Sequence, residues 1–281
     1  MKTAIITDST AYLTKEEREK YHIHLIPLSV NFTTETFEEE VSITASEFYE
    51  KVRTGNEFPK TTQPSVGAFV TKFEELAKDY DEIVTIHLSS GISGTYSGAI
   101  QAAQMVEDVK VYAFDSEVAC APQGMFAIEA AKMAAEGASG EEIIEALTQL
   151  QKSLNAYFIV EDLSHLQRGG RISATSAFVG GLLQVKPILC FRNKVIVPFE
   201  KIRTRKKAMK RVEELLSEEV KKYEQLQVAI IHANCEQDAH DWVSELRPLY
   251  PTVEFKISYF GPVIGTHLGE GSIAMGWMAK R

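Results

Sequence analysis

The chain has 281 residues, of which 44% are hydrophobic and 25% charged, as in globular proteins with a well-buried core. Its net charge of −9 argues against broad binding of nucleic acids or anionic membranes, and it contains no apolar run of the ~18 residues that a membrane span needs. The first residues predict a strand rather than a signal peptide, and three widely spaced cysteines predict neither a disulfide framework nor a zinc site, so we expect a cytoplasmic protein.

Strands and helices alternate along the first half of the chain. Apolar runs with β character cover residues 2–7, 24–32, 83–88, 110–114 and 156–160. Helical patterns lie between them, and three of these follow capping boxes that start at Thr14, Thr44 and Ser139. This alternation predicts an α/β fold with a mostly parallel sheet and helices on both faces.

A Ser/Gly-rich loop, residues 89–98, separates the strand at 83–88 from a helical pattern that begins at Ala99. Such a loop directs backbone N–H groups, hydroxyls and a positive helix dipole at one point, which favours an anion. The loop lacks the Gly-Lys-Ser/Thr ending of a P-loop and the G-x-S-x-G pattern of a nucleophile elbow. Ser93 is therefore either an anion ligand or simply the N-cap of the helix.

Two further hydroxyls, those of Thr61 and Thr62, lie just before another predicted helix. Pro64 keeps the preceding residue extended, and Ser65 is placed to cap the helix over 66–78. Hydroxyls on a loop at this position can meet a ligand, although the sequence alone favours an ordinary capped loop.

The composition changes near residue 161. Arg168 and Arg171 flank a glycine pair, which predicts either an anion-binding fork or two surface arginines on a turn. Apolar runs at 185–191 and 195–199 predict a hairpin. The basic segment 201–207, which includes Arg203, opens a helix that extends to about residue 223. A solvated helix face is its usual explanation, and a docking patch for an acidic partner or phosphorylated substrate is the alternative.

The last third contains strands at 227–232 and 253–257, the latter being the last strand that we expect. A glycine-rich loop over 261–272 then precedes a helix. His267 lies between glycines in this loop, where a ligand contact and a structural role are equally plausible. No His/Cys/Glu spacing suggests a metal site.

Six of these segments together resemble the DegV family of bacterial fatty-acid-binding proteins, whose kinase-coupled members are called FakB. They span nearly the whole chain in the family's order and spacing: Thr7-Asp8-Ser9, Thr61-Thr62-Gln63-Pro64-Ser65, Ser89-Ser90-Gly91-Ile92-Ser93-Gly94-Thr95-Tyr96, Arg168-Gly169-Gly170-Arg171-Ile172, Lys186-Pro187-Ile188-Leu189 and Gly265-Thr266-His267. Glu270 departs from the family pattern, which usually has proline there.

The resemblance implies two α/β lobes, at residues 1–160 and 161–281, with a long-chain fatty acid such as palmitate, stearate or oleate between them. Residues 65–80 would pack as a crossover helix. The carboxylate would be held by hydroxyls and a histidine, and arginines would support the site or dock a partner: Thr61, Thr62, Ser93 and His267 in the first role, and Arg168, Arg171 and Arg203 in the second.

Such a protein needs no cofactor and performs no catalysis alone. The resemblance implies that a separate ATP-dependent fatty acid kinase phosphorylates the carboxylate and that the acyl phosphate enters phospholipid synthesis. From their apolar neighbourhood, Phe178, Leu182, Leu183 and Ile188 are candidates to line the tail tunnel.

Two other functions stay open at this stage. One is an enzyme for a small phosphorylated or keto substrate with His267 as acid or base, since the DegV fold resembles a subunit of dihydroxyacetone kinases. The other is regulatory nucleic-acid binding through residues 201–211, which the negative net charge disfavours.

Overall fold

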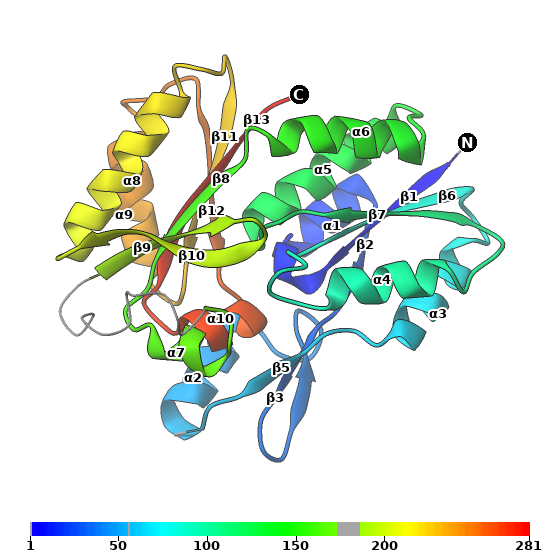
Figure 1. Cartoon of the computed structure of the whole chain (residues 1–281), viewed down its shortest axis with the longest axis horizontal. Coiled ribbons are helices and arrows are strands. Elements are labelled where there is room, and N and C mark those ends of the chain that lie inside the picture. Colours follow the sequence, from blue (N-terminus) through cyan, green and yellow to red (C-terminus); the bar gives the residue numbers. More distant parts are fainter. Residues whose placement is uncertain (1, 56, 173–185) are drawn as a thin grey trace.

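The computed structural model describes residues 2–55, 57–172 and 186–281. They form an α/β structure with one sheet in each of two lobes and a small third sheet below them (Figure 1). The three sheets have the strand orders β2-β1-β6-β7, β10-β9-β8-β13-β11-β12 and β4-β3-β5.

The first lobe contains the parallel sheet that the alternating pattern predicts. Its pairs β1–β2, β1–β6 and β6–β7 are all parallel. The strands are β1 (Thr3–Asp8), β2 (Ile23–Ile26), β6 (Glu82–His87) and β7 (Lys110–Asp115). Helices cover both faces, with α3 (Val66–Leu76) and α4 (Thr95–Ala103) on one side and α1 (Lys15–Tyr21), α5 (Ala121–Ala135) and α6 (Gly140–Gln151) on the other. The predicted capping boxes at Thr14, Thr44 and Ser139 are all confirmed.

The second lobe contains a mixed sheet. Its strands are β8 (Asn155–Ile159), β9 (Lys186–Arg192), β10 (Val195–Ile202), β11 (Leu226–His232), β12 (Glu254–Tyr259) and β13 (Ile273–Ala279). The predicted hairpin is confirmed as β9–β10, and β11–β12 is parallel, but the other described pairs are antiparallel. β8 pairs with β9 and β13, so the expected lobe boundary at residue 160 falls after a strand of this second sheet. Its outer face packs against α8 (Arg205–Glu219) and α9 (Glu236–Leu246).

The expectation of a helix after residue 272 is wrong, because β13 is a strand at the centre of this sheet. Six of its seven residues are buried, so it lacks the apolar–polar alternation that marks a half-exposed strand. Its alanines and methionines also favour helix over strand by intrinsic propensity. Burial on both faces therefore outweighed the local preference.

Shorter elements connect the two lobes. They are the 3₁₀ helix η1 (Ser9–Ala11), β3 (Ser29–Asn31), β4 (Thr36–Glu38), α2 (Ala45–Gly55), β5 (Lys60–Thr62), α7 (Ser164–Arg168) and α10 (Pro262–Leu268). In Figure 1, α2, α7 and α10 lie together beside the small sheet. Thr61 and Thr62 lie in the edge strand β5 rather than in the expected loop.

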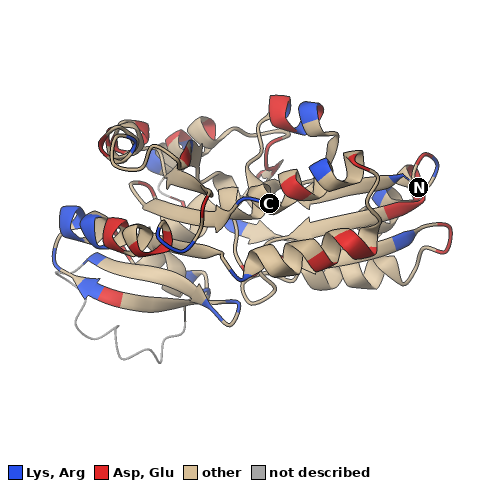
Figure 2. Ribbon diagram, turned by 90° about the horizontal axis from the view of Figure 1, so that it is seen from above, with Lys and Arg blue, Asp and Glu red and all other residues tan. Residues whose placement is uncertain are grey.

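One hydrophobic core passes through both lobes. It joins the inner faces of the two large sheets around α5, whose residues pack against β1 on one side and β13 on the other. Basic and acidic residues are interspersed along the helices and loops of the ribbon (Figure 2). Among the residues described, no helix is long and apolar enough to cross a membrane.

Two arginines in the first half of α8 are paired with acidic side chains. Arg205 contacts Glu161 and Asp238 at 2.8 and 2.9 Å, and Arg211 contacts Glu200 at 2.8 Å. These pairs fit the interpretation of a solvated helix face.

Candidate functional site

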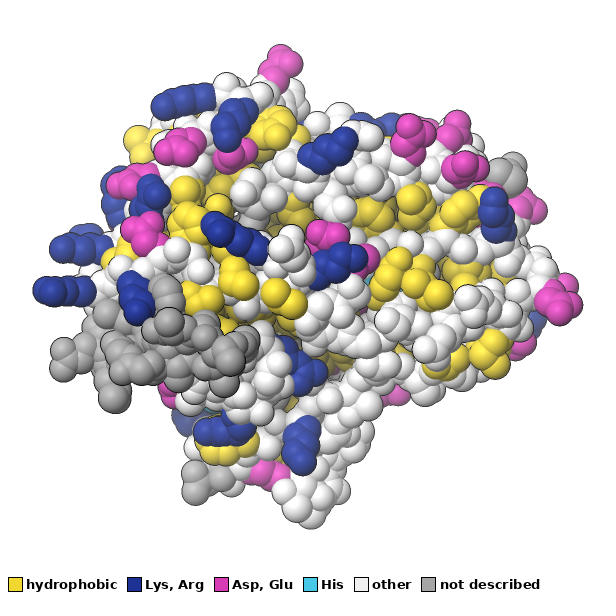
Figure 3. All heavy atoms as spheres, viewed as in Figure 1, with side chains coloured by type: hydrophobic (Ala, Val, Ile, Leu, Met, Phe, Trp, Pro, Cys, Tyr) yellow, Lys and Arg dark blue, Asp and Glu magenta, His cyan; other side chains and the backbone are white. Residues whose placement is uncertain are grey.

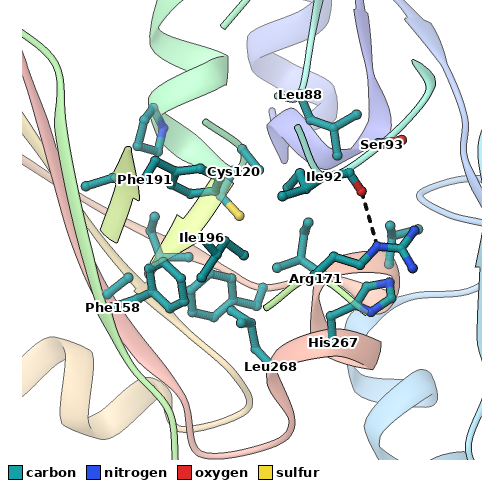
Figure 4. Close-up of a pocket in the computed structure, with 18 of the residues that line it drawn as sticks. Leu88, Ile92, Ser93, Cys120, Phe158, Arg171, Phe191, Ile196, His267 and Leu268 are labelled. Atoms are coloured by element: carbon teal, nitrogen blue, oxygen red, sulfur yellow. Dashed lines mark hydrogen bonds between the residues drawn. The ribbon is translucent and has the colours of Figure 1, made fainter. Parts of the chain in front are cut away.

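A cavity of about 250 Å³ lies between the two lobes. Most of its lining is apolar, and one end is polar (Figure 4). The polar end contains Thr61, Thr62, Gln63, Ser93, Gly94, Arg171 and His267. All four residues expected to hold a carboxylate therefore line one cavity, although they come from three separate parts of the chain.

Thr61 and His267 contact each other directly. The Oγ1 of Thr61 lies 2.9 Å from the Nε2 of His267. β5 places Thr61 by pairing it with Val30 of β3, and the last turn of α10 carries His267. A hydroxyl and an imidazole at this distance can both reach one small anion.

Ser93 lies just before α4. The N-cap residue of this helix is Gly94, so Ser93 is not the N-cap that the alternative interpretation required. Its Oγ lies 2.9 Å from the Oγ1 of Thr95 and accepts a bond from the Thr95 N–H. Thr62 differs in being exposed, and its Oγ1 accepts a bond from Asn31 at 2.7 Å.

Gln63 joins the threonine strand to the serine loop, and sequence reasoning gave it no role. Its amide donates to the carbonyl of Gly94 at 3.3 Å. A Cβ at position 94 would lie 2.2 Å from the Gln63 Oε1, so only glycine permits this approach. The feature of the sequence that could have pointed to Gln63 is Pro64, which follows it and restricts its backbone.

The three expected arginines occupy different environments. Arg171 lines the cavity, and its Nε donates to the carbonyl of Ile92 at 3.1 Å. The guanidinium of Arg168 lies 3.5 Å from the centre of the exposed Phe58 ring, outside the cavity lining. Arg203 is exposed and also lies outside the lining. Only Arg171 is thus close enough to influence a ligand in the cavity.

His267 is uncharged at neutral pH. Burial lowers its pKa to about 4, and the nearby charges of Arg171 and His165 act in the same direction. Its Nδ1 is buried without a hydrogen-bond partner among the described residues. Gly169 lies directly against this atom, because a Cβ there would come within 2.2 Å of it.

We predict that His267 in the ligand-free protein stays neutral down to about pH 5. Because the pKa of His267 in the folded protein lies below its ordinary value, the folded state favours the neutral ring. The resulting contribution to the free energy of unfolding is fully present above pH 6.5. That contribution, roughly 3 kcal/mol, is lost as the pH falls toward 4. An NMR titration of the ring measures the pKa, and His267→Gln should show a smaller loss of stability between pH 6.5 and 4. Titration of His267 near pH 6.5 would contradict this description.

The apolar part of the cavity is built largely on one face of the second sheet. Phe158, Ile231 and Ala274 are cross-strand neighbours on β8, β11 and β13, and all three line it. Phe191 and Ile196 extend the lining onto the hairpin β9–β10 (Figure 4). A long apolar chain can therefore lie against this sheet.

The structure corrects one expected tunnel residue. Ile188 is buried among residues that pack against α8 and α9, on the opposite face of the sheet. Alternate side chains of a strand face opposite ways, and it is Leu189 and Phe191 of β9 that face the inner core. The other candidates, Phe178, Leu182 and Leu183, lie outside the described residues.

The segment after α10 holds the departure at Glu270. Its carboxylate pairs with Arg53 at 2.7 Å and accepts a bond from Asn234 at 2.6 Å. Gly269 and Gly271 on either side have positive φ angles of 77° and 83°. Two glycines with positive φ and an ion pair thus define this turn.

Within the described part of the chain, no group of three His, Cys, Asp or Glu residues could hold a metal ion.

Known proteins resemble this chain over its whole length. The model of the DegV family matches residues 2–280. Protein DegV of Bacillus subtilis is 54% identical over 281 residues, which is 100% of both chains, and its crystal structure, that of a fatty acid binding protein, matches with a TM-score of 0.95.

Two more distant solved structures show the same fold. A DegV family protein from Thermus thermophilus, described by its fatty acid binding, is 28% identical with a TM-score of 0.93 and 100% coverage of both chains. A stearic acid-binding protein from Eubacterium ventriosum is 25% identical with a TM-score of 0.89, covering 99% of this chain and 98% of its own. With a family model matched from residue 2 to residue 280 and a relative at 54% identity, this chain belongs to the DegV family.

Proposed function

We propose that the protein binds a long-chain fatty acid such as palmitate, stearate or oleate, with the tail in the apolar cavity and the carboxylate at its polar end. The observation that carries this proposal is the convergence of Thr61, Ser93 and His267 at one end of a mainly apolar cavity. Relatives that match the whole chain are described as fatty acid binding proteins, which agrees with it.

The physical chemistry of the cavity suits such a ligand. Burial of each methylene contributes ~0.8 kcal/mol, so a palmitate tail supplies on the order of 10 kcal/mol before ordering costs. The carboxylate needs hydrogen-bond donors because an unpaired buried charge is expensive. The Thr61, Thr62 and Ser93 hydroxyls and the neutral His267 supply donors without placing a full positive charge against the oxygens, and Arg171 adds a more distant one.

We further propose that the protein is a carrier that acts in the cytoplasm and leaves catalysis to a partner. An ATP-dependent fatty acid kinase would phosphorylate the bound carboxylate, and the acyl phosphate would enter phospholipid synthesis. The exposure of Thr62 supports this, because it puts the polar end within reach of the surface.

The kinase would dock through arginines around the cavity mouth and on the second lobe: Arg168, Arg171 and Arg203. Lys and Arg side chains lie over the left part and the centre of the face in Figure 3, with some acidic side chains among them, and further acidic side chains lie toward the upper right. The basic side chains at the centre of this face suit a partner with an acidic docking surface.

The function is tested by identifying the ligand. Protein expressed in bacteria, denatured and analysed by mass spectrometry, should release a long-chain fatty acid, and delipidated protein should take up palmitate or oleate. Protein that is empty after purification and stays empty after incubation with both acids would contradict the proposal. A triose covalently trapped on His267 would instead favour an enzyme for small keto substrates.

A further inference from the structure

A buried glutamate joins the first lobe to α10, the helix that carries His267. The side chain of Glu39 is fully buried. Its Oε1 accepts bonds from the Val263 N–H at 2.7 Å and from the Tyr12 hydroxyl at 3.0 Å, and its Oε2 accepts one from Ser9 at 2.7 Å. One carboxyl group thus contacts the 3₁₀ helix η1, the residue that follows it and the first turn of α10.

Other first-lobe groups hold the same segment. The Tyr12 hydroxyl, which donates to Glu39, also accepts a bond from the Ile264 N–H at 3.2 Å, and the Tyr49 hydroxyl donates to the carbonyl of Phe260 at 2.8 Å. Phe260, Ile264 and His267 all line the cavity. The position of this cavity wall therefore depends on polar groups of the first lobe, none of which touches the ligand site.

We infer that Glu39 and Tyr12 are positioning residues for ligand binding: they fix α10 so that His267 meets Thr61 and the apolar wall keeps its shape. The inference rests on the proposed fatty-acid binding. It assigns to the first lobe a control over affinity that acts through the backbone of α10.

Glutamine is the conservative substitute at position 39. Burial raises the pKa of Glu39 to about 8 despite its hydrogen bonds, which favours the uncharged carboxyl at neutral pH. An amide has the same shape and offers the oxygen that the Val263 N–H and the Tyr12 hydroxyl need, while its NH2, like the protonated oxygen of the uncharged carboxyl, donates to the Ser9 hydroxyl oxygen. Glu39→Gln should keep α10 in place, whereas Glu39→Ala removes the acceptor from both groups.

The chain contains a matched control for this substitution. Glu82 is also buried, and its carboxylate accepts bonds from the backbone N–H of Gly140 at 2.7 Å and from the Tyr112 hydroxyl at 3.1 Å. It therefore holds the start of α6 as Glu39 holds the start of α10, but neither Glu82 nor any residue of α6 lines the cavity. Glu82→Ala removes equivalent contacts at a distance from the ligand.

The test measures how fast a fluorescent fatty acid, cis-parinaric acid, leaves the loaded protein. Glu39→Ala should release the probe about tenfold faster than the wild type, because a tenfold effect is typical of the loss of one buried hydrogen bond. Glu39→Gln should stay within about threefold of the wild type. Glu82→Ala should release the probe at the wild-type rate, although thermal unfolding shows a comparable loss of stability.

A second pair of variants covers the case in which Glu39→Ala does not fold. Tyr12→Phe keeps the ring and removes only the hydroxyl, and Tyr112→Phe does the same at the control site. Faster release from Tyr12→Phe than from Tyr112→Phe supports the inference. Equal release rates for these two variants overturn it. If the wild type binds no fatty acid, the proposed function itself fails, which is a distinguishable result.

Discussion

Replacing Ala274 by phenylalanine is expected to abolish the binding of palmitate and oleate while leaving the empty protein folded. Ala274 is the second residue of β13 and lies between Phe158 and Ile231, and all three line the apolar part of the cavity. A benzyl group there occupies space that the tail needs. Each methylene that can no longer enter costs ~0.8 kcal/mol, or about fourfold in affinity.

Titration calorimetry with a series of acids measures this effect. Ala274→Val should be intermediate, and both variants should shift the preference toward shorter chains such as laurate. Circular dichroism and thermal unfolding of the ligand-free variants check that the fold is intact. Undiminished palmitate binding by folded Ala274→Phe would place the tail elsewhere.

Replacing Thr61 by valine is expected to weaken palmitate binding by about 5- to 150-fold, because losing a hydrogen bond to a buried charged group costs ~1–3 kcal/mol. The substitution keeps the shape of the side chain and removes the hydroxyl that lies 2.9 Å from His267. Ser93→Ala should act in the same direction. Thr62→Val should have a smaller effect, because Thr62 is exposed and already bonded to Asn31.

Methyl palmitate separates a head-group effect from a general disturbance of the cavity. The ester has the same tail, but its carbonyl is an uncharged and weaker acceptor than a carboxylate, so Thr61→Val should reduce its binding much less than that of the acid. An equal loss for the acid and the ester would mean that Thr61 shapes the cavity and does not hold the head group.

Local chemistry made much of the fold predictable. Helix starts at Thr14, Thr44 and Ser139 follow from side-chain capping, and the hairpin β9–β10 follows from two apolar runs around a short polar turn. The central strand β13 could not be predicted in this way, because a strand buried on both faces has no alternation to reveal it.

The polar end of the site could be anticipated and the apolar end could not. Thr61, Ser93 and His267 are each ambiguous by themselves, and it is the order and spacing of their segments, which resemble those of the DegV family, that single them out. An apolar residue such as Ile188 carries no sign of which cavity it lines, because that depends on strand parity and on which sheet face meets α8. Glu39 gave no signal, since its role arises only when α10 packs over it.

The most direct test is a crystal structure of the delipidated protein reloaded with palmitate. We predict that the carboxylate lies within hydrogen-bond distance of the Thr61 Oγ1 and the Ser93 Oγ, next to His267. The tail should extend along the face formed by β8, β11 and β13. A palmitate bound in the reverse direction, or outside the space between the lobes, would contradict the account.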